Sequence, residues 1–265
     1  MERTFWHKQT SAQPLFPDLE WSRPESKALA GKLLIIGGNA FGFQAPAEAY
    51  MEAGKAGVGT AHVILPQRVQ SLVGKVLPAV EYAMSNPSGG FSQMALGELL
   101  AQAQWADGVL LAGDFGRNSE TAILLEKFLA KYEGQVTLTK DAVDYFTAAP
   151  APLLGHQNTT LVLSFAQLQK LASAAHFPSA FTFDMDLLRL VDNLHEFSRD
   201  HSVHIVTKHL DSILVAVNGE VSTTKLENDL EVWRLKTAAH TSVWWLQNPM
   251  KPFESLTAAL LPLSE

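Results

Sequence analysis

The sequence predicts a three-layer α/β domain with a mostly parallel central sheet. Short apolar runs such as Leu33–Ile36 and Gly108–Gly113 alternate along the chain with stretches of helical spacing. These runs are apolar at nearly every position rather than at every second one, which is typical of strands buried on both faces. The alternation of such strands with helices indicates a parallel sheet with helices on each side.

The first half of the chain carries the clearest elements. Gly37-Gly38 ends the first strand, Pro66 ends the second, and the stretch 86–90 breaks the chain after the third. We expect Ser119 to be the N-cap of a helix whose apolar residues recur at helical spacing. The expected strands are Leu33–Ile36, His62–Leu65, Val80–Met84, Gly108–Gly113 and Gln135–Thr139, and the expected helices are Pro46–Lys55, Gln67–Val76, Met94–Trp105 and Ser119–Lys131.

The second half gives weaker signals of the same kind. His204–Val206 and Ile213–Val217 are typical of an antiparallel pair. Asp184 is expected to cap the helix that follows it. The Trp244-Trp245 pair indicates packing in a core or in a subunit interface. The remaining strand is expected at Leu161–Leu163, with helices over Ala166–Ala175, Phe183–Phe197, Leu230–Leu246 and Phe253–Leu261.

We expect two parts, an N-terminal arm over residues 1–30 and a single α/β domain over residues 31–265. Prolines at 14, 17 and 24 argue against a long helix in the arm. Its aromatic residues argue against a free tail. The arm is therefore expected to pack on the domain surface or on a neighbouring subunit.

Composition excludes several classes of protein. Hydrophobic residues make up 47% of the 265-residue chain and charged residues 18%, a balance typical of a globular protein and not of a disordered one. The formal net charge is −7 and no long basic run occurs, so nucleic acid and anionic membranes are not expected partners. The absence of cysteine excludes disulfides, thiolate zinc sites and a cysteine nucleophile. No signal peptide or membrane span is visible, and we expect a cytoplasmic protein.

Two glycine-bearing turns are the strongest candidate binding elements. The first is Gly37–Gly42 and the second is Gly113–Arg117, each between a strand and a helix. Ligands bind at the carboxyl ends of the strands in such sheets, and glycine allows backbone N–H groups to approach an anion. Neither turn has the dinucleotide GxGxxG spacing or a Walker lysine, so a simple tight turn is the alternative. Arg117 is expected to bind a phosphate or to pair with Asp114 or Glu120.

Other polar residues give weaker indications. Lys208 follows a strand and is expected either to steer a phosphate or to be solvated. His201 and His204 are three residues apart, which places them on opposite faces of a strand, so we expect no metal site there.

Several stretches taken in order point to a known family. Residues 31–39, 44–49 and 54–59 resemble the opening of the ADP- or ATP-dependent NAD(P)H-hydrate dehydratases, which have a ribokinase-like fold. Residues 110–117 are similar to that family's Gly-Pro-Gly-Leu-Gly segment. Residues 136–143 are similar to its Leu-Asp-Ala-Asp-Ala-Leu strand end, where Asp141 matches the second aspartate. Residues 205–208 resemble its strand ending in Lys-Gly, so the resemblance covers about residues 26–217.

The resemblance implies a ligand set and an assembly. It implies ADP or ATP, often with Mg²⁺, an NAD(P)H-type ligand, and a homo-oligomer. The matching positions for ligand contacts are Gly37, Gly38, Asn39, Gln44, Ala45, Gly113, Phe115, Gly116, Arg117 and Lys208.

The departures from the family concern its catalytic segments. The Thr-Pro-His-Pro-Gly-Glu turn is shortened to residues 164–167. The Gly-Gly-Thr-Gly-Asp start of a late helix, whose Asp is the family's base, aligns with residues 238–242. Ser242 then replaces the base, and a serine cannot act as one near neutral pH without an activator. His240, whose reference pKa is near 6.5, and Asp141 are the substitute candidates, and a surface helix position is the plain alternative for His240.

Three hypotheses remain. The first is a non-catalytic relative, a pseudoenzyme, that keeps the cleft and binds a nucleotide or dinucleotide. The second is an active nucleotide-dependent NAD(P)H-hydrate dehydratase, which is a lyase, or a phosphotransferase like the sugar kinases. The third is a structural protein whose cleft has closed, with Trp244-Trp245 and the aromatic arm building a subunit interface. We rank the first above the second.

Overall fold

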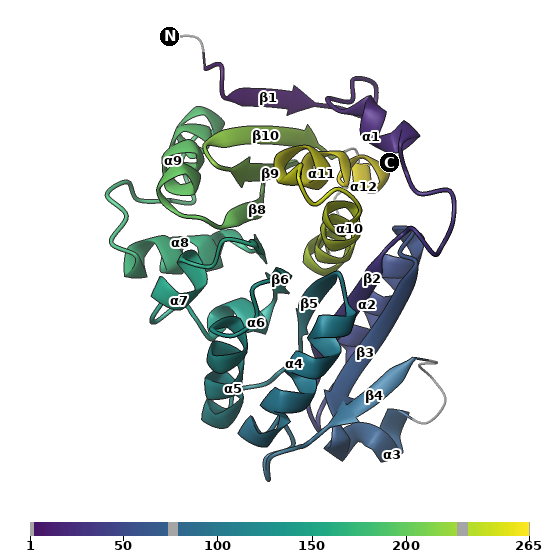
Figure 1. Ribbon diagram of the computed structural model, residues 1–265. Coiled ribbons are helices and arrows are strands. Elements are labelled where there is room, and N and C mark those ends of the chain that lie inside the picture. The colour runs from purple at the N-terminus through teal and green to yellow at the C-terminus, as the bar shows by residue number, and fades with distance from the viewer. Residues whose placement is uncertain (1–2, 74–78, 227–232, 265) are drawn as a thin grey trace.

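A computed structural model describes residues 3–73, 79–226 and 233–264 of the chain (Figure 1). Within this part, ten strands form one sheet in the order β1-β10-β9-β8-β7-β6-β5-β2-β3-β4. The strands are β1 (Trp6–Gln9), β2 (Lys32–Gly37), β3 (Thr60–Pro66), β4 (Val80–Ala83), β5 (Gly108–Gly113), β6 (Gln135–Thr139), β7 (Thr159–Leu163), β8 (His204–His209), β9 (Ser212–Val217) and β10 (Glu220–Lys225).

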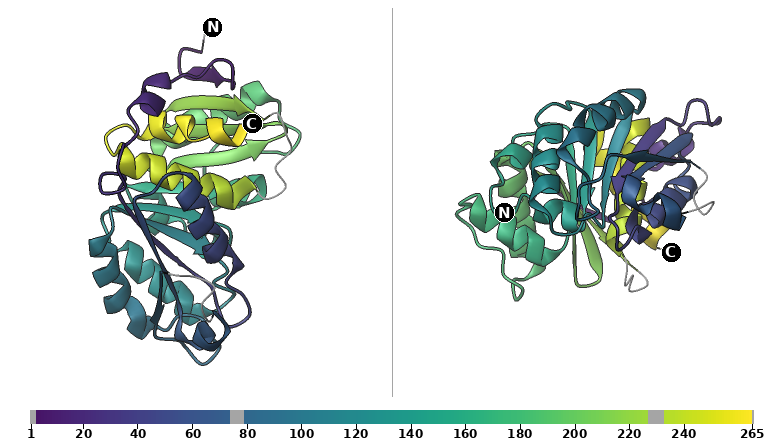
Figure 2. Two further views of the ribbon diagram at one scale, coloured as in Figure 1. Left: turned by 90° about the vertical axis from the view of Figure 1, so that its right-hand side faces the viewer. Right: turned by 90° about the horizontal axis from the view of Figure 1, so that it is seen from below.

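Helices cover both faces of this sheet, as the right-hand view of Figure 2 shows. They are α1 (Pro17–Trp21), α2 (Gln44–Lys55), α3 (Gln70–Val73), α4 (Leu96–Trp105), α5 (Ser119–Leu129), α6 (Asp141–Asp144), α7 (Ala151–Leu154), α8 (Phe165–Ala174), α9 (Leu187–Asp200), α10 (Trp233–Gln247), α11 (Pro252–Ala258) and α12 (Leu261–Ser264), with short 3₁₀ turns η1 (Gln67–Val69) and η2 (Gln93–Ala95). No helix in the described ranges has the length and apolar character needed to cross a bilayer.

In the order of the sheet, all strands from β8 through β7, β6, β5, β2 and β3 to β4 run parallel. β8, β9 and β10 form an antiparallel meander. The predicted three-layer α/β architecture is confirmed, and so is the antiparallel pairing of β8 with β9. Because parallel strands point the same way, the carboxyl ends of β2, β5, β6 and β7 all lie at one edge of the sheet. That edge is where the candidate site is built.

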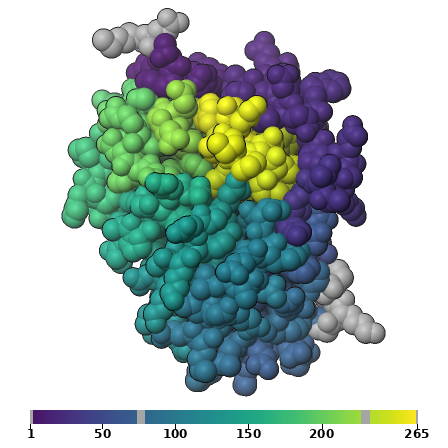
Figure 3. All heavy atoms as spheres, viewed as in Figure 1, coloured from purple at the N-terminus to yellow at the C-terminus, as the bar shows by residue number. Residues whose placement is uncertain are grey.

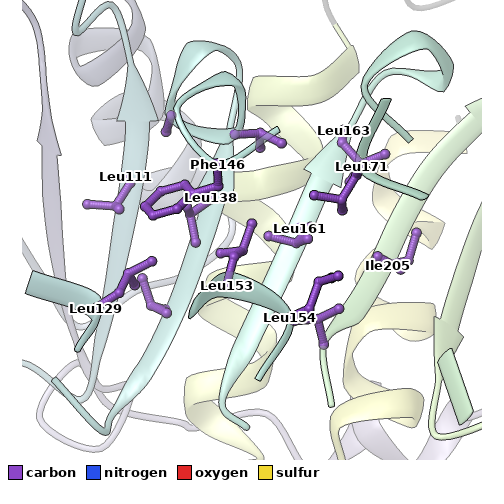
Figure 4. Close-up of a cluster of buried hydrophobic side chains, with 14 of the residues drawn as sticks. Leu111, Leu129, Leu138, Phe146, Leu153, Leu154, Leu161, Leu163, Leu171 and Ile205 are labelled. Carbon is purple, nitrogen blue, oxygen red and sulfur yellow. The ribbon is translucent and has the colours of Figure 1, made fainter. Parts of the chain in front are cut away.

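Alternate residues of the central strands face opposite helical layers. Leu34 and Ile36 of β2 join the core beneath α4, α5 and α7–α9, whereas Leu33 and Ile35 join the core beneath α2 and α10. Figure 4 shows part of the first core, where leucines of β5, β6 and β7 meet Leu153 of α7. Burial of each such side chain stabilises the fold by about 1.5–3 kcal/mol, which explains why these strands are apolar throughout.

The N-terminal arm is part of the sheet of its own chain. β1 pairs in parallel with β10 at the sheet edge, and the buried amide of Gln9 donates hydrogen bonds to Thr224 Oγ1 at 3.1 Å and Thr257 O at 2.9 Å. Arg3 donates two hydrogen bonds, of 2.6 and 2.8 Å, to the carboxylate of Asp192. Figure 3 shows the arm lying against the C-terminal helices.

The predictions of two helix caps are wrong by one or two residues. Asn118, not Ser119, caps α5, because its Oδ1 accepts from Glu120 N at 2.9 Å and from the next backbone N–H. Asp186, not Asp184, caps α9, which begins at Leu187 and not at residue 183. In both cases the capping side chain is the one directly before the first helical residue, where it reaches the unpaired N–H groups.

Trp244 and Trp245 are both buried inside their own chain on α10. The hypothesis that this pair builds a subunit interface is therefore wrong, and their expected role in a core is confirmed. Part of the helix predicted over 230–246 and part of that predicted over 67–76 lie outside the described residues.

Candidate functional site

The two glycine-bearing turns meet at the carboxyl edge of the sheet. Gly38 N donates to Gly113 O at 2.9 Å, and the amide of Asn39 donates to Asp114 O. A Cβ at Gly116 would lie only 3.2 Å from Asn39 Nδ2. The close approach of the second turn to Asn39 therefore depends on glycine at this position.

The N-terminus of α2 is occupied by a carboxylate of the chain itself. Asp114 Oδ2 accepts from Ala45 N at 2.7 Å, and Oδ1 lies 3.0 Å from Lys140 Nζ. Asp114 has a φ of 59°, a left-handed conformation that Asp tolerates better than most residues. A negative charge is stabilising at a helix N-terminus. Asp114 thus supplies internally the anion that the sequence leads us to expect from a ligand.

The backbone donors of the first turn are also engaged within the protein. Asn39 N donates to Gly42 O at 2.9 Å, and Ala40 N donates to Gly89 O at 2.9 Å. Phe41 N donates to Asn39 Oδ1 at 2.7 Å. In this conformation the turn therefore offers few free N–H groups to a phosphate.

Asp141, the first residue of α6, is hydrogen-bonded to the second turn. Its Oδ2 accepts from Gly116 N at 3.0 Å, while its Oδ1 is buried and accepts no hydrogen bond from the described residues. Burial raises the pKa of the Asp141 carboxyl, and the neighbouring Asp114 adds to the rise, whereas Lys140 opposes it. The carboxyl therefore holds a proton more readily than an exposed aspartate does.

A hollow of about 390 Å³ opens beside this carboxylate. Arg117 and the first residues of α5 form one wall, and Asp141, Asp144 and Tyr145 form the other. Tyr145 Oη donates to Gly116 O at 2.6 Å, which ties the wall to the turn. The hollow thus places a cation and a helix N-terminus opposite two carboxylates.

Arg117 does not form the predicted ion pair. Asp114 pairs with Lys140 instead, and Glu120 accepts hydrogen bonds from Ser92 Oγ and Gln93 N. Among the described residues Arg117 has no acidic partner, so its guanidinium is available to a ligand.

Three aromatic rings at the carboxyl ends of β7 and β8 were missed by the sequence analysis. Phe165 lies with its ring centroid 5.0 Å from that of Phe183 and 5.5 Å from that of His209. Phe183 is 66% exposed. We call Phe165, Phe183 and His209 the aromatic platform. Their only sequence signal was that two of them stand at the ends of adjacent parallel strands.

A polar link joins the aromatic platform to the hollow. Gln167, two residues beyond Phe165, donates to Asp144 Oδ1 at 2.8 Å and to Lys140 O at 2.7 Å. Arg234, near the start of α10, donates to Gln167 Oε1 at 3.1 Å. The edge therefore carries two arginines, the hollow and a partly exposed aromatic surface, and hydrogen bonds through Gln167 connect the hollow to the segment that bears Phe165.

The predictions of His240 and Ser242 as site residues are wrong. Both lie two turns or more inside α10, where Ser242 Oγ donates to Ala238 O at 2.7 Å. His240 packs between α10 and α2, with Nε2 3.5 Å from Glu52 Oε2, and burial lowers its pKa to about 4. The expected helix start at residues 238–242 is a helix interior, which also excludes the surface alternative for His240.

The other predicted contact residues are spread along the edge. Gln44 begins α2, and Phe115 is buried in the first core beside Phe91 and Tyr145. Lys208 lies near the end of β8, paired in register with Ile213 of β9.

Comparison with known proteins identifies the architecture. No family model matches the sequence. The structure is similar to that of a ribokinase-like superfamily protein of Enterococcus faecalis, with a TM-score of 0.74 and 15% identity over 100% of this chain and 88% of the other. The chain has the ribokinase-like fold. An ADP/ATP-dependent NAD(P)H-hydrate dehydratase of Bacillus subtilis, co-crystallised with ATP and Mg²⁺, gives a TM-score of 0.63 at 12% identity, covering 95% and 87% of the two chains.

A curated relative extends the likeness of this ribokinase-like chain to its sequence. The chain is 33% identical over 121 residues to the bifunctional NAD(P)H-hydrate repair enzyme Nnr of Methanocaldococcus jannaschii. The match covers 44% of this chain and 23% of that protein, so it spans about a quarter of the relative's length. The predicted resemblance to NAD(P)H-hydrate dehydratases is therefore confirmed as a likeness of fold and of part of the sequence.

The ribokinase-like edge offers no ready-made metal cluster. Across residues 3–73, 79–226 and 233–264, no three histidine, aspartate or glutamate side chains converge as metal ligands. Asp114, the carboxylate nearest the two turns, is already paired with Lys140. The described residues therefore supply no ready set of protein ligands for Mg²⁺.

Proposed function

We propose that this chain binds a nucleotide or dinucleotide at the carboxyl edge of its sheet and is impaired in phosphoryl transfer. The observation that carries the proposal is the Arg117 hollow, whose wall residue Asp144 is hydrogen-bonded to Gln167 of the segment that bears Phe165. Phosphate oxygens would lie against the guanidinium of Arg117 beside the start of α5, where a cation and the positive end of the helix dipole favour an anion. The base would stack on Phe183, a contact worth about 1–3 kcal/mol.

The relatives support the class of ligand. The Bacillus subtilis dehydratase was co-crystallised with ATP and Mg²⁺, and the curated relative is named for repair of NAD(P)H hydrates. For this chain we propose ADP or ATP as the ligand, with Mg²⁺ brought by its phosphates, or a dinucleotide of the NAD(P)H type. Impaired transfer is supported by the positions of His240 and Ser242, which are buried in α10 away from the hollow.

Calorimetry of Arg117→Gln tests this proposal. Charge-assisted hydrogen bonds contribute about 1.5–3 kcal/mol, so we expect the Kd for ADP or ATP to rise by roughly 10–150-fold. Arg199→Gln is the matched control, because Arg199 is an exposed arginine on α9 whose ion-pair partner is the exposed Asp200. The proposal fails if ADP, ATP, AMP and NADH all give no heat, or if the two variants bind equally well.

An active enzyme is the second candidate, and the observation that favours it is the Asp141 carboxylate on the wall of the hollow, whose Oδ1 accepts no hydrogen bond from the described residues and whose pKa is raised by burial. A carboxylate with a raised pKa is better suited to accept a proton from a hydroxyl. We expect that any ATP- or ADP-dependent dehydration of hydrated NAD(P)H would fall by at least about 100-fold in Asp141→Asn. Retention of full turnover in this variant would exclude Asp141 as the base, and absence of turnover in the parent would leave the binding proposal.

A further inference from the structure

We propose a second ligand site at the opposite end of the sheet, for a small planar molecule that carries an uncharged carboxamide. The site is a hollow of about 370 Å³ at the amino ends of β7 and β8. It is independent of the nucleotide proposal, since none of its residues belongs to the carboxyl edge. The side chains and loops that line it are Gln157, Asn158, Ser202, His204, Asn218, Trp245, Pro249 and Pro252.

The floor of this hollow consists of two buried rings with unused hydrogen-bonding groups. His204 and Trp245 are 5% and 2% exposed, and their ring centroids lie 4.8 Å apart in an edge-to-face arrangement. Trp245 Nε1 is buried and has no hydrogen-bond partner in the described part of the chain. His204 uses Nδ1 for a 3.1 Å hydrogen bond with Thr160 Oγ1, and no described residue is hydrogen-bonded to its Nε2.

A buried donor without an acceptor destabilises the fold, so these rings point to a ligand that supplies the acceptor. An indole N–H can only donate, and therefore it requires an oxygen or nitrogen acceptor such as a carbonyl. An indole N–H points outward in the plane of its ring, so a carbonyl oxygen that reaches the ring edge at Nε1 would accept from Trp245 and replace the missing partner.

The rim favours an uncharged amide over an ion. Its polar side chains are the amides of Gln157 and Asn218, the amide of Asn158, which donates to Glu133 O, and the hydroxyl of Ser202. Among the described residues, no acidic or basic side chain other than His204 lines the hollow, and burial lowers the pKa of His204 to about 4, which keeps the ring uncharged at neutral pH. Carboxamides of the rim both donate and accept, which is the pattern that another carboxamide complements.

The size of the hollow and its proline walls favour a planar ring. A dry cavity of about 150 Å³ accommodates benzene, so a hollow of about 370 Å³ has room for a ring bearing a carboxamide. Pro249 and Pro252, which flank the connection between α10 and α11, provide apolar surfaces for its faces.

Benzamide is the probe, followed by the indole N–H resonances in ¹H–¹⁵N spectra of the whole chain. We expect a saturable shift of the Trp245 indole N–H, assigned with Trp245→Phe, and a Kd of about 10 mM or tighter for this nine-atom ligand. Trp245→Phe keeps an aromatic ring but removes the donor, so binding to this variant is followed by the backbone amide shifts of the lining residues, and we expect it to be about fivefold weaker. Trp105→Phe is the control, because Trp105 lies on α4, far from Trp245 in the sequence, and stacks on His62. This variant should bind benzamide as the parent does.

Asn218→Gly provides a second variant on the exposed rim. The substitution removes an amide, and glycine tolerates the left-handed φ of 49° at this turn, so we expect the fold to be retained. This variant therefore tests the site even if Trp245→Phe is unstable. Weaker benzamide binding in this variant supports the site. No movement of the Trp245 indole up to the solubility limit, or unchanged affinity in both variants, would overturn it. Tighter binding of benzoate than of benzamide would overturn the assignment to an uncharged carboxamide. Arg117→Gln should leave benzamide binding intact, which separates this site from the nucleotide proposal.

Discussion

Replacement of Gly113 by alanine should destabilise the protein by about 2–5 kcal/mol. Gly113 has a φ of +103°, where an L-residue is strained. An added Cβ would lie 2.8 Å from Lys140 Cβ and 3.0 Å from Asp141 Oδ1. Both neighbours are held in place by the turn, so the strand end must shift and the hydrogen bond between Gly38 N and Gly113 O is weakened. Urea unfolding measures the loss.

Gly42→Ala is the matched control for this expectation. Gly42 lies in the partner turn, but an added Cβ there would meet nothing within 4 Å, and its φ is not in the left-handed range. Its free energy of unfolding should stay within about 1 kcal/mol of the parent. Equal effects of the two substitutions would show that the packing around Asp141 is not what requires a glycine.

Acidification from pH 6.5 towards pH 4 should remove about 3 kcal/mol of stability through His204 alone. Burial lowers the pKa of His204 to about 4 in the folded state, whereas in the unfolded chain the pKa is near 6.5. Between these values the unfolded state binds more protons, so stability is complete above pH 6.5 and is lost as the pH falls. Burial lowers the pKa of His240 in the same direction.

The measurement is the difference in unfolding free energy between pH 7 and pH 4.5 for the parent and for His204→Asn. The unfolding free energy of the variant should depend less steeply on pH, because most of the His204 contribution is removed. This holds even if the variant is less stable than the parent at pH 7. His7→Asn is the control, because His7 is partly exposed at the sheet edge beside Glu220. A slope in His204→Asn as steep as in the parent would contradict the burial account.

The sequence predicted the strands that are buried by hydrophobic packing and missed those held by polar pairing. β5 reads as a continuous apolar run, and its burial on both faces explains why. β10 carries Ser222, Thr223 and Thr224, all buried, and β1 carries Gln9. β1 is defined by its pairing with β10, more than 200 residues away, which no local pattern contains. β10 pairs with β9 directly before it, but its buried polar residues form no apolar run that would mark it as a strand.

The sequence predicted that the two glycine turns lie at the carboxyl edge of the sheet, but not which side chains contact them. Glycine turns after β2 and β5 indicated the carboxyl edge correctly, because the topology of parallel sheets requires it. That Asp114 would cap α2 depends on a contact across 69 residues with Ala45. His240 was misplaced because a shift of a few residues in a helix moves a side chain from its end to its interior.

We propose that internal carboxylates hold the glycine turns while the phosphates of the ligand bind at Arg117. Backbone amide chemical shifts recorded during a titration with ATP and Mg²⁺ test this directly. We expect the amides of residues 116–121 and those beside the aromatic platform to move on titration. The amides of residues 38–45 should stay in place, since their donors are engaged by Asp114 and by the turn itself. A shift of the amide resonances of residues 38–45 on addition of ATP, with no shift of those of residues 116–121, would contradict the proposed position of the phosphates.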